Sequence, residues 1–80
     1  MLNEVTFKNR WDEELTVKIG THVGFKCDVE QTAEVVEIKW QSNGYCGQRL
    51  TFVVKAPPDG FSGNYIGRDD YADIDAYETW

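Results

Sequence analysis

Apolar and polar residues alternate along most of this chain with a period of two residues, and helical periodicity is nearly absent. Alternation of this kind is typical of antiparallel strands that have one buried and one solvated face. It recurs over residues 5–7, 15–19, 23–27, 35–40, 50–55 and 71–76. We therefore expect a single all-β domain over residues 1–80, with five or six short strands in a strongly bent antiparallel sheet.

The clearest element is a central hairpin. Apolar residues occupy positions 36, 38 and 40 on one strand and positions 50, 52 and 54 on the next, and the segment 41–48 between them is rich in turn residues. Pairing Trp40 with Leu50 would place Ile38 beside Phe52, and position 36 beside position 54. This register builds an apolar core face, with Trp40 expected to plug the core from its centre.

The sequence also predicts the structure of the segments between the strands. Residues 11–14 predict an acidic turn, and residues 28–32 predict a polar connection. Pro57-Pro58 ends the strand that precedes it, because proline donates no ladder hydrogen bond. Farther on, Phe61 and Ile66 are expected to fold under the sheet and close one end of the core.

Charge narrows the choice of partners. The chain has 8 basic and 14 acidic residues, which gives a net charge of −6. The acidic surplus disfavours direct nucleic-acid binding, because phosphates would be repelled, and it favours a basic protein surface as partner. The ordinary alternative is that the charge only keeps a small protein soluble.

Much of this charge lies near the end of the sequence, where five carboxylates fall between Asp69 and Glu78. A strand from Tyr71 would place Asp73, Asp75 and Tyr77 on one face, and would turn the alanines and the isoleucine between them toward the core. Trp80 is open to two interpretations, core packing or partner contact. The candidate partner-binding residues are Tyr65, Asp69, Asp70, Tyr71, Asp73, Asp75, Tyr77 and Glu78.

Residues that could support catalysis or metal binding are sparse. His22 is the only histidine and has no placed nucleophile; Cys27 continues an apolar alternation, whereas Cys46 lies in a turn. The aspartates of residues 69–75 miss the spacing of a calcium-binding loop, and no phosphate-binding loop is present. We therefore predict no enzyme activity, no cofactor and no metal site.

The sequence also predicts the cellular compartment of the protein. Residues 1–10 lack the apolar region of a secretory signal, and no apolar run reaches membrane-spanning length. With no disulfide framework either, the expected setting is cytoplasmic, without membrane contact.

The stretch Val17-Lys18-Ile19-Gly20-Thr21-His22-Val23-Gly24-Phe25 resembles the V-x-x-G-x-x-V entry of KOW, Tudor and other SH3-like barrels. The strands expected at 33–40 and 50–56, and the ending at 74–80, are similar to the later strands and final turn of such barrels. The chain also resembles small bacteriophage proteins of this type. Two features depart from the pattern: the barrels that bind nucleic acid are usually basic, and residues before Leu15 have no counterpart in a minimal barrel.

The resemblance implies an SH3-like barrel and, by analogy with small acidic phage proteins, an inhibitor of a host nuclease, restriction enzyme or CRISPR complex. In that hypothesis the carboxylates act as a DNA mimic and occupy a basic groove. A second hypothesis is an SH3-like adaptor, in which Tyr65, Tyr71, Tyr77 and Trp80 line a groove for an extended basic peptide. A third is an assembly protein whose residues 1–7 pair with a neighbouring subunit, so a dimer stays possible.

Overall fold

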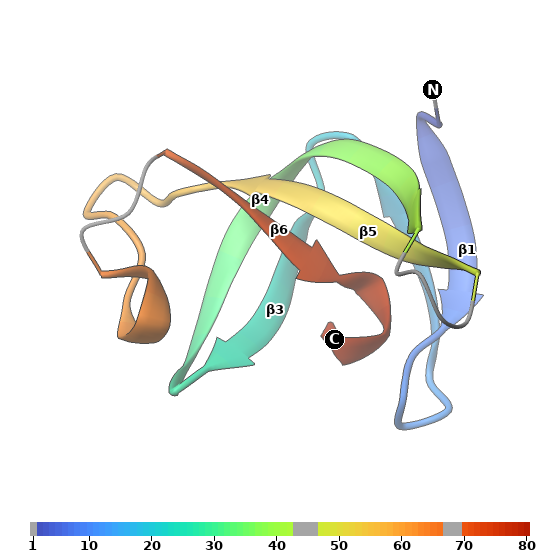
Figure 1. Cartoon of the computed structure of the whole chain (residues 1–80), viewed down its shortest axis with the longest axis horizontal. Coiled ribbons are helices and arrows are strands. Elements are labelled where there is room, and N and C mark those ends of the chain that lie inside the picture. Colours follow the sequence, from blue (N-terminus) through green and yellow to red (C-terminus); the bar gives the residue numbers. More distant parts are fainter. Residues whose placement is uncertain (1, 43–46, 67–69) are drawn as a thin grey trace.

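The computed structural model describes residues 2–42, 47–66 and 70–80. These residues form six β-strands and two short 3₁₀ turns, with no α-helix among them (Figure 1). The elements are β1 (Glu4–Lys8), β2 (Glu14–Lys18), β3 (His22–Cys27), β4 (Val29–Ser42), β5 (Gln48–Lys55), η1 (Gly63–Tyr65), β6 (Tyr71–Asp75) and η2 (Ala76–Glu78). The predicted all-β class is therefore confirmed.

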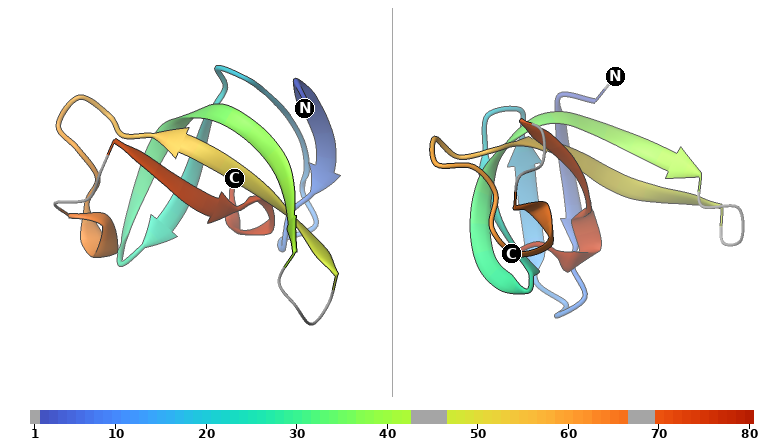
Figure 2. Two further views of the ribbon diagram at one scale, coloured as in Figure 1. Left: turned by 45° about the horizontal axis from the view of Figure 1, so that its top comes forward. Right: turned by 60° about the vertical axis from the view of Figure 1, so that its left-hand side comes forward.

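The strands build two antiparallel sheets, a β1-β2 hairpin and a four-stranded sheet of order β3-β4-β5-β6. The 14-residue β4 bends along its length, so its first part pairs with β3 and its second part with β5 (Figures 1 and 2). The far end of the β4-β5 hairpin extends beyond the rest of the molecule (Figure 2). Neither sheet closes into a barrel, so the closed SH3-like barrel stays a prediction.

Hydrogen bonds outside the named ladders join the separate parts. Gly24 of β3 and Trp80 exchange two backbone hydrogen bonds, each of 3.0 Å, which bring the end of the sequence onto β3. Leu2 forms an isolated bridge with Ile38, so the N-terminal hairpin also contacts β4. The Leu2–Ile38 bridge thus joins the two sheets, whereas the Gly24–Trp80 bonds tie the segment after β6 to the opposite edge strand of the four-stranded sheet.

The central hairpin has the predicted register from Glu37 to Ser42. Trp40 pairs with Leu50 and Ile38 pairs with Phe52. A β-bulge between Val35 and Glu37 then shifts the register by one residue, so that Val35 pairs with residue 54. The bulge places Val35 and Ile38 in the core, at 0% and 1% exposure. We expected Trp40 to pack at the centre of the core, but it is 48% exposed.

Residues 28–32 are not the polar connection that the sequence predicts. Asp28 alone makes the turn, with a φ of 72°, and β4 begins at Val29, which pairs directly with Cys27. Aspartate tolerates this left-handed conformation better than most residues. The polar side chains that follow lie on the exposed part of a strand.

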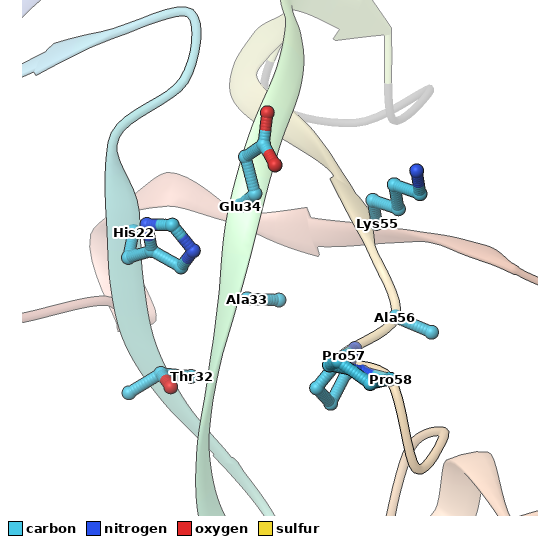
Figure 3. A pocket seen from close by; sticks show the side chains of 8 residues that line it. All are labelled: His22, Thr32, Ala33, Glu34, Lys55, Ala56, Pro57 and Pro58. Atoms are coloured by element: carbon cyan, nitrogen blue, oxygen red, sulfur yellow. The ribbon is translucent and has the colours of Figure 1, made fainter.

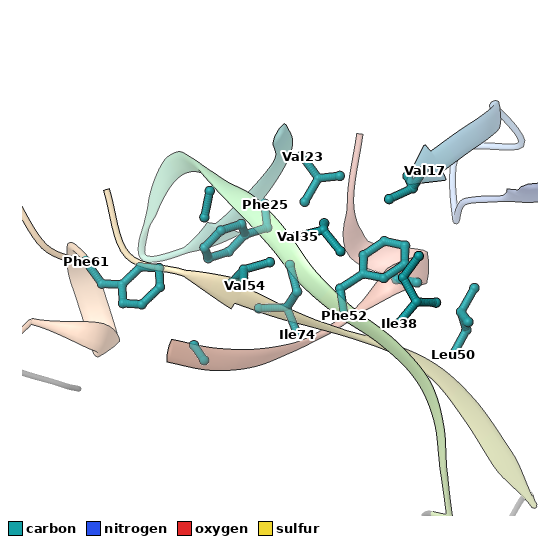
Figure 4. Close-up of a cluster of buried hydrophobic side chains, with 13 residues drawn as sticks. Val17, Val23, Phe25, Val35, Ile38, Leu50, Phe52, Val54, Phe61 and Ile74 are labelled. Atoms are coloured by element: carbon teal, nitrogen blue, oxygen red, sulfur yellow. The ribbon is translucent and has the colours of Figure 1, made fainter. Parts of the chain in front are cut away.

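Within the described part of the chain, thirteen buried hydrophobic residues form the core cluster (Figure 4). Phe52 is fully buried, and Phe7 of β1 contacts its ring edge-on at 5.7 Å, which docks the β1-β2 hairpin on the larger sheet. Edge-to-face ring pairs of this kind contribute about 0.5–1.5 kcal/mol beyond simple burial. Phe61 is buried as predicted, whereas Ile66 is 72% exposed and does not close the core.

No helix in the described part of the chain is long and apolar enough to span a membrane.

Candidate functional site

The predicted acidic strand has the phase that the sequence indicates. Ala72 and Ile74 of β6 are buried against the core, and Asp73 is exposed on the opposite face. Tyr77 follows in η2 and is 40% exposed. Asp69, the first of the candidate residues in this stretch, lies outside the described residues.

The carboxylates of this stretch are largely neutralised within the molecule. Three ion pairs join it to cations elsewhere in the chain: Asp73 with Lys39 at 3.5 Å, Asp75 with Arg49 at 3.0 Å, and Glu78 with Arg10 at 2.8 Å. We expected these groups to face solvent as a surplus of negative charge. The surface of β6 is instead a mixed-charge face, which weakens the case for a DNA-mimicking surface there.

Several of the candidates also have structural roles. The carboxylate of Asp75 accepts a hydrogen bond from the backbone N–H of Tyr77 at 3.0 Å, which caps η2. Tyr77 packs edge-on against Phe7 at 6.1 Å. These contacts explain why an acidic and an aromatic residue occupy these positions without any partner.

The remaining candidates are dispersed. Tyr65 packs on Phe25 and Phe61 at the far end of the core, and its hydroxyl donates to the Asp73 carbonyl at 3.5 Å. The carbonyl of Asp70 accepts a hydrogen bond from the backbone N–H of residue 56, and Tyr71 is 55% exposed. The structure therefore does not gather the predicted residues into one groove.

A different pair of aromatic residues does form a groove. Trp11, in the turn between β1 and β2, contacts Trp80 edge-on, with ring centroids 5.8 Å apart and planes at 77°. Both indoles are accessible, at 52% and 41% exposure. Together with Glu13 and Glu30 they line a cavity of about 360 Å³, which we call the tryptophan cleft.

The tryptophan cleft owes its shape to a buried asparagine. Asn9 is only 5% exposed, and its side-chain oxygen accepts hydrogen bonds from the backbone N–H groups of Trp11 and Glu13, both at 3.0 Å. Its amide nitrogen donates to the Glu13 carboxylate at 2.9 Å and to the carbonyl of Thr79 at 2.8 Å. One side chain thus fixes the turn that carries Trp11 and ties that turn to the residue before Trp80.

The other wall of the cleft depends on a glycine. The indole of Trp80 lies so close to Gly24 that any Cβ there would overlap with ring atoms. Because Gly24 and Trp80 also share two backbone hydrogen bonds, the ring is held over β3 from both its backbone and its side chain. The cleft is therefore preformed.

The electrostatics of the tryptophan cleft differ from those of β6. Neither Glu13 nor Glu30 forms an ion pair with any residue that the structure describes. Lys26 stands opposite Glu30 in the β3-β4 ladder, and it lines a neighbouring cavity of about 380 Å³ that shares Trp11, Trp80 and Glu30 with the cleft. Arg10 also lines that neighbouring cavity, and its guanidinium carbon lies 5.4 Å from the Trp11 ring centroid.

A larger cavity lies elsewhere, on β3, β4 and the end of β5. Its volume is about 430 Å³, and Figure 3 shows Ala33 and Glu34 of β4 between His22 and the Lys55–Pro58 segment. Its charged groups are of both signs, and its floor is a sheet rather than a pair of aromatic rings. This cavity gives no reason to prefer one class of ligand.

Among residues 2–42, 47–66 and 70–80, no group of three or more histidine, cysteine or acidic side chains is placed to hold a metal ion. The tryptophan cleft offers exposed π-faces and two carboxylates, which suit the binding of a cation rather than a chemical step. Sequence reasoning left Trp80 open between core packing and an aromatic groove, and it missed Trp11 and Glu30. The available signal was a tryptophan within a short polar turn, two residues after an asparagine that can bond the turn backbone.

No protein-family model, no curated protein and no solved structure matches this chain. Its function must therefore be inferred from the chemistry of the cleft.

Proposed function

We propose that the chain is a non-enzymatic protein-binding module whose tryptophan cleft holds a basic side chain of an extended segment on a partner. The observation that carries this proposal is the exposed Trp11–Trp80 pair at 5.8 Å, flanked by the unpaired carboxylates of Glu13 and Glu30. Large exposed aromatic residues that line a cavity are typical of interaction sites.

Physical chemistry favours a cation in this position. A cation over an exposed indole gains about 0.5–1 kcal/mol, and more when the site is dry. The two carboxylates add attraction at longer range, which speeds encounter and selects basic partners. Because Asn9 and Gly24 already fix both walls, little ordering entropy is lost on binding.

The SH3-like barrel belongs to the same proposal. Three features support it: the bent β4 shared between two neighbours, the 3₁₀ turn η2 after β6, and the return of Trp80 to β3. In such an arrangement the two backbone hydrogen bonds between Gly24 and Trp80 take the place of a final short strand.

The acidic-inhibitor hypothesis uses the same net charge but a different surface. In that hypothesis an acidic phage-type protein occupies the basic groove of a CRISPR complex or nuclease through β6, where Asp70 forms no ion pair with a described residue and Tyr71 is exposed. The pairing of Asp73 and Asp75 with Lys39 and Arg49 makes it the weaker candidate.

The assembly hypothesis, with residues 1–7 pairing with a neighbour, is tested by a mass measurement in solution.

The test is a titration of the ¹⁵N-labelled protein with a ten-residue peptide of alternating lysine or arginine and glycine, followed through the tryptophan indole N–H signals. We expect the signals of Trp11 and Trp80 to shift and that of Trp40 to stay. Trp40 is a built-in control, because it is 48% exposed but is not paired with another tryptophan in the described contacts.

Matched variants locate the binding surface. Glu13→Gln/Glu30→Gln should weaken peptide binding about three- to tenfold through the loss of two attractive charges. Asp73→Asn/Asp75→Asn removes the same charge from β6 and should leave the affinity unchanged. Equal shifts at all three indoles, or a loss of affinity only in the β6 variant, would contradict the proposal; the second outcome would support the inhibitor surface.

A further inference from the structure

We infer that the preferred occupant of the tryptophan cleft is the guanidinium of an arginine, rather than the ammonium of a lysine. This inference rests on the proposed function and names the chemical group that the cleft selects. Its basis is an arrangement that the chain already contains beside the cleft.

Arg10 is an internal example of the interaction. Its guanidinium carbon lies 5.4 Å from the centroid of the Trp11 ring, and its Nη1 donates to the Glu78 carboxylate at 2.8 Å. An indole ring and a carboxylate thus hold one guanidinium in the neighbouring cavity, which Arg10 and Glu78 line. The Arg10 side chain is 56% exposed, so this geometry forms in contact with water.

The tryptophan cleft repeats these elements without a cation. Trp11 and Trp80 supply the rings, and Glu13 and Glu30 supply the carboxylates. No lysine or arginine is among the residues that line it, whereas the neighbouring cavity contains Arg10 and Lys26. Trp11, Trp80 and Glu30 line both cavities, so the tryptophan cleft differs from its neighbour in having no cation of its own among its lining residues.

The geometry favours a planar cation over a spherical one. Two indoles at 77° present a face and an edge, so a flat guanidinium can stack on one ring while its N–H groups point along the plane toward carboxylates. The carboxylate of Glu13 is held in place by the Asn9 amide at 2.9 Å, so it does not need to be ordered on binding. An ammonium is more strongly hydrated and gains less from this arrangement.

The surrounding charges limit the cleft to one cation. Lys26 faces Glu30 across the ladder, and Glu78 is already paired with Arg10. Only part of the negative charge of Glu30, together with that of Glu13, is free for a ligand. The partner is therefore a segment with one inserted arginine, rather than a dense basic tract that needs many contacts.

Three ten-residue peptides test the inference: one with a single central arginine in a glycine-serine background, and twins in which this residue is lysine or citrulline. Citrulline keeps the shape of arginine and removes its charge. Affinity is measured from the indole signals of Trp11 and Trp80, with Trp40 as the internal reference. We expect the arginine peptide to bind about threefold or more tightly than the lysine twin, and the citrulline twin not to bind measurably.

Each outcome has a separate meaning. Equal or tighter binding of the lysine twin would overturn the arginine preference and leave the proposed function standing. Binding of the citrulline twin as tight as that of arginine would overturn the role of charge. If none of the peptides shifts the Trp11 and Trp80 signals, both the inference and the proposed function fail. Trp11→Ala is the control variant, because it removes a ring from an exposed turn and leaves the core residues in place.

Discussion

The acidic groups of β6 and those of the tryptophan cleft have the same chemistry and opposite surroundings. On β6, Asp73 and Asp75 lie beside neighbouring strands that supply Lys39 and Arg49. At the cleft, Glu13 and Glu30 lie in or near turns, where no ion pair with a described residue forms. The Asp73 and Asp75 carboxylates are thus paired with cations of the same sheet, whereas those of Glu13 and Glu30 stay available for other molecules, although Lys26 stands opposite Glu30 in the ladder.

The two regions also differ in what positions them. β6 is placed by a ladder with β5 and by the apolar side chains on its inner face. The cleft is placed by a buried amide and by a backbone contact between Gly24 and Trp80. A substitution on β6 should therefore change stability alone, while a substitution at the cleft supports should change both stability and binding.

The largest effect is expected for Asn9→Ala. This change removes four hydrogen bonds and leaves the buried carbonyl of Thr79 without its partner, so the free energy of unfolding should fall by about 2–3 kcal/mol. Urea unfolding measures the loss. The indole signal of Trp11 in the folded protein should also move, and an unchanged Trp11 signal would show that Asn9 does not position the cleft.

Gly24→Ala should come next. The new methyl group would overlap with the indole of Trp80, so the ring must move and the free energy of unfolding should fall by about 1–3 kcal/mol. Binding of a basic peptide should be lost with it. His22→Ala on the same strand is the control, because His22 is exposed and lies away from the cleft. Retained binding in Gly24→Ala would mean that the Trp80 wall is dispensable.

On the β6 side, Asp75→Ala should lower the free energy of unfolding by about 1 kcal/mol, because the residue caps η2 and pairs with Arg49. Asp75→Ser separates the two contributions, since serine keeps a capping oxygen and loses the ion pair. We expect serine to restore most of the stability in urea unfolding, and neither variant to change peptide affinity. A serine variant as unstable as the alanine variant would assign the effect to the ion pair.

The smallest effect is expected for Asp73→Asn. Its ion pair with Lys39 at 3.5 Å is partly exposed, so its loss should change the free energy of unfolding by less than about 1 kcal/mol. Peptide titration should give the wild-type affinity. A clear drop in affinity would indicate that the peptide binds on β6 and not in the tryptophan cleft.

The alternation of apolar and polar residues predicted much of the fold, because the apolar face of each strand is determined by residues within that strand. The register of Ile38 with Phe52 followed from matching two such faces. The bulge after Val35 was not predictable in this way, since it depends on how β4 bends between two neighbours. Nor did the register predict the exposure of Trp40, since its ladder partner Leu50 is buried in the core.

The candidate site was harder to predict than the fold. Charge density pointed to Asp73 and Asp75, but a sequence does not show which cations stand on the next strand. The tryptophan cleft was missed because its parts are distant, as the hydrogen bond from Asn9 to Thr79 spans 70 residues. Of the residues that line the cleft, only Trp80 had been considered for a groove, as one of two interpretations, because it follows the acidic segment.

The bond between Asn9 and Thr79 also bears on how the chain folds. A contact across 70 residues closes a long loop, which is an event of high contact order and is expected late in folding. The two indoles meet only when that loop closes, so their mutual quenching would report the last step of the reaction. A ligand that recognises both rings would then bind the finished protein alone and would slow its unfolding.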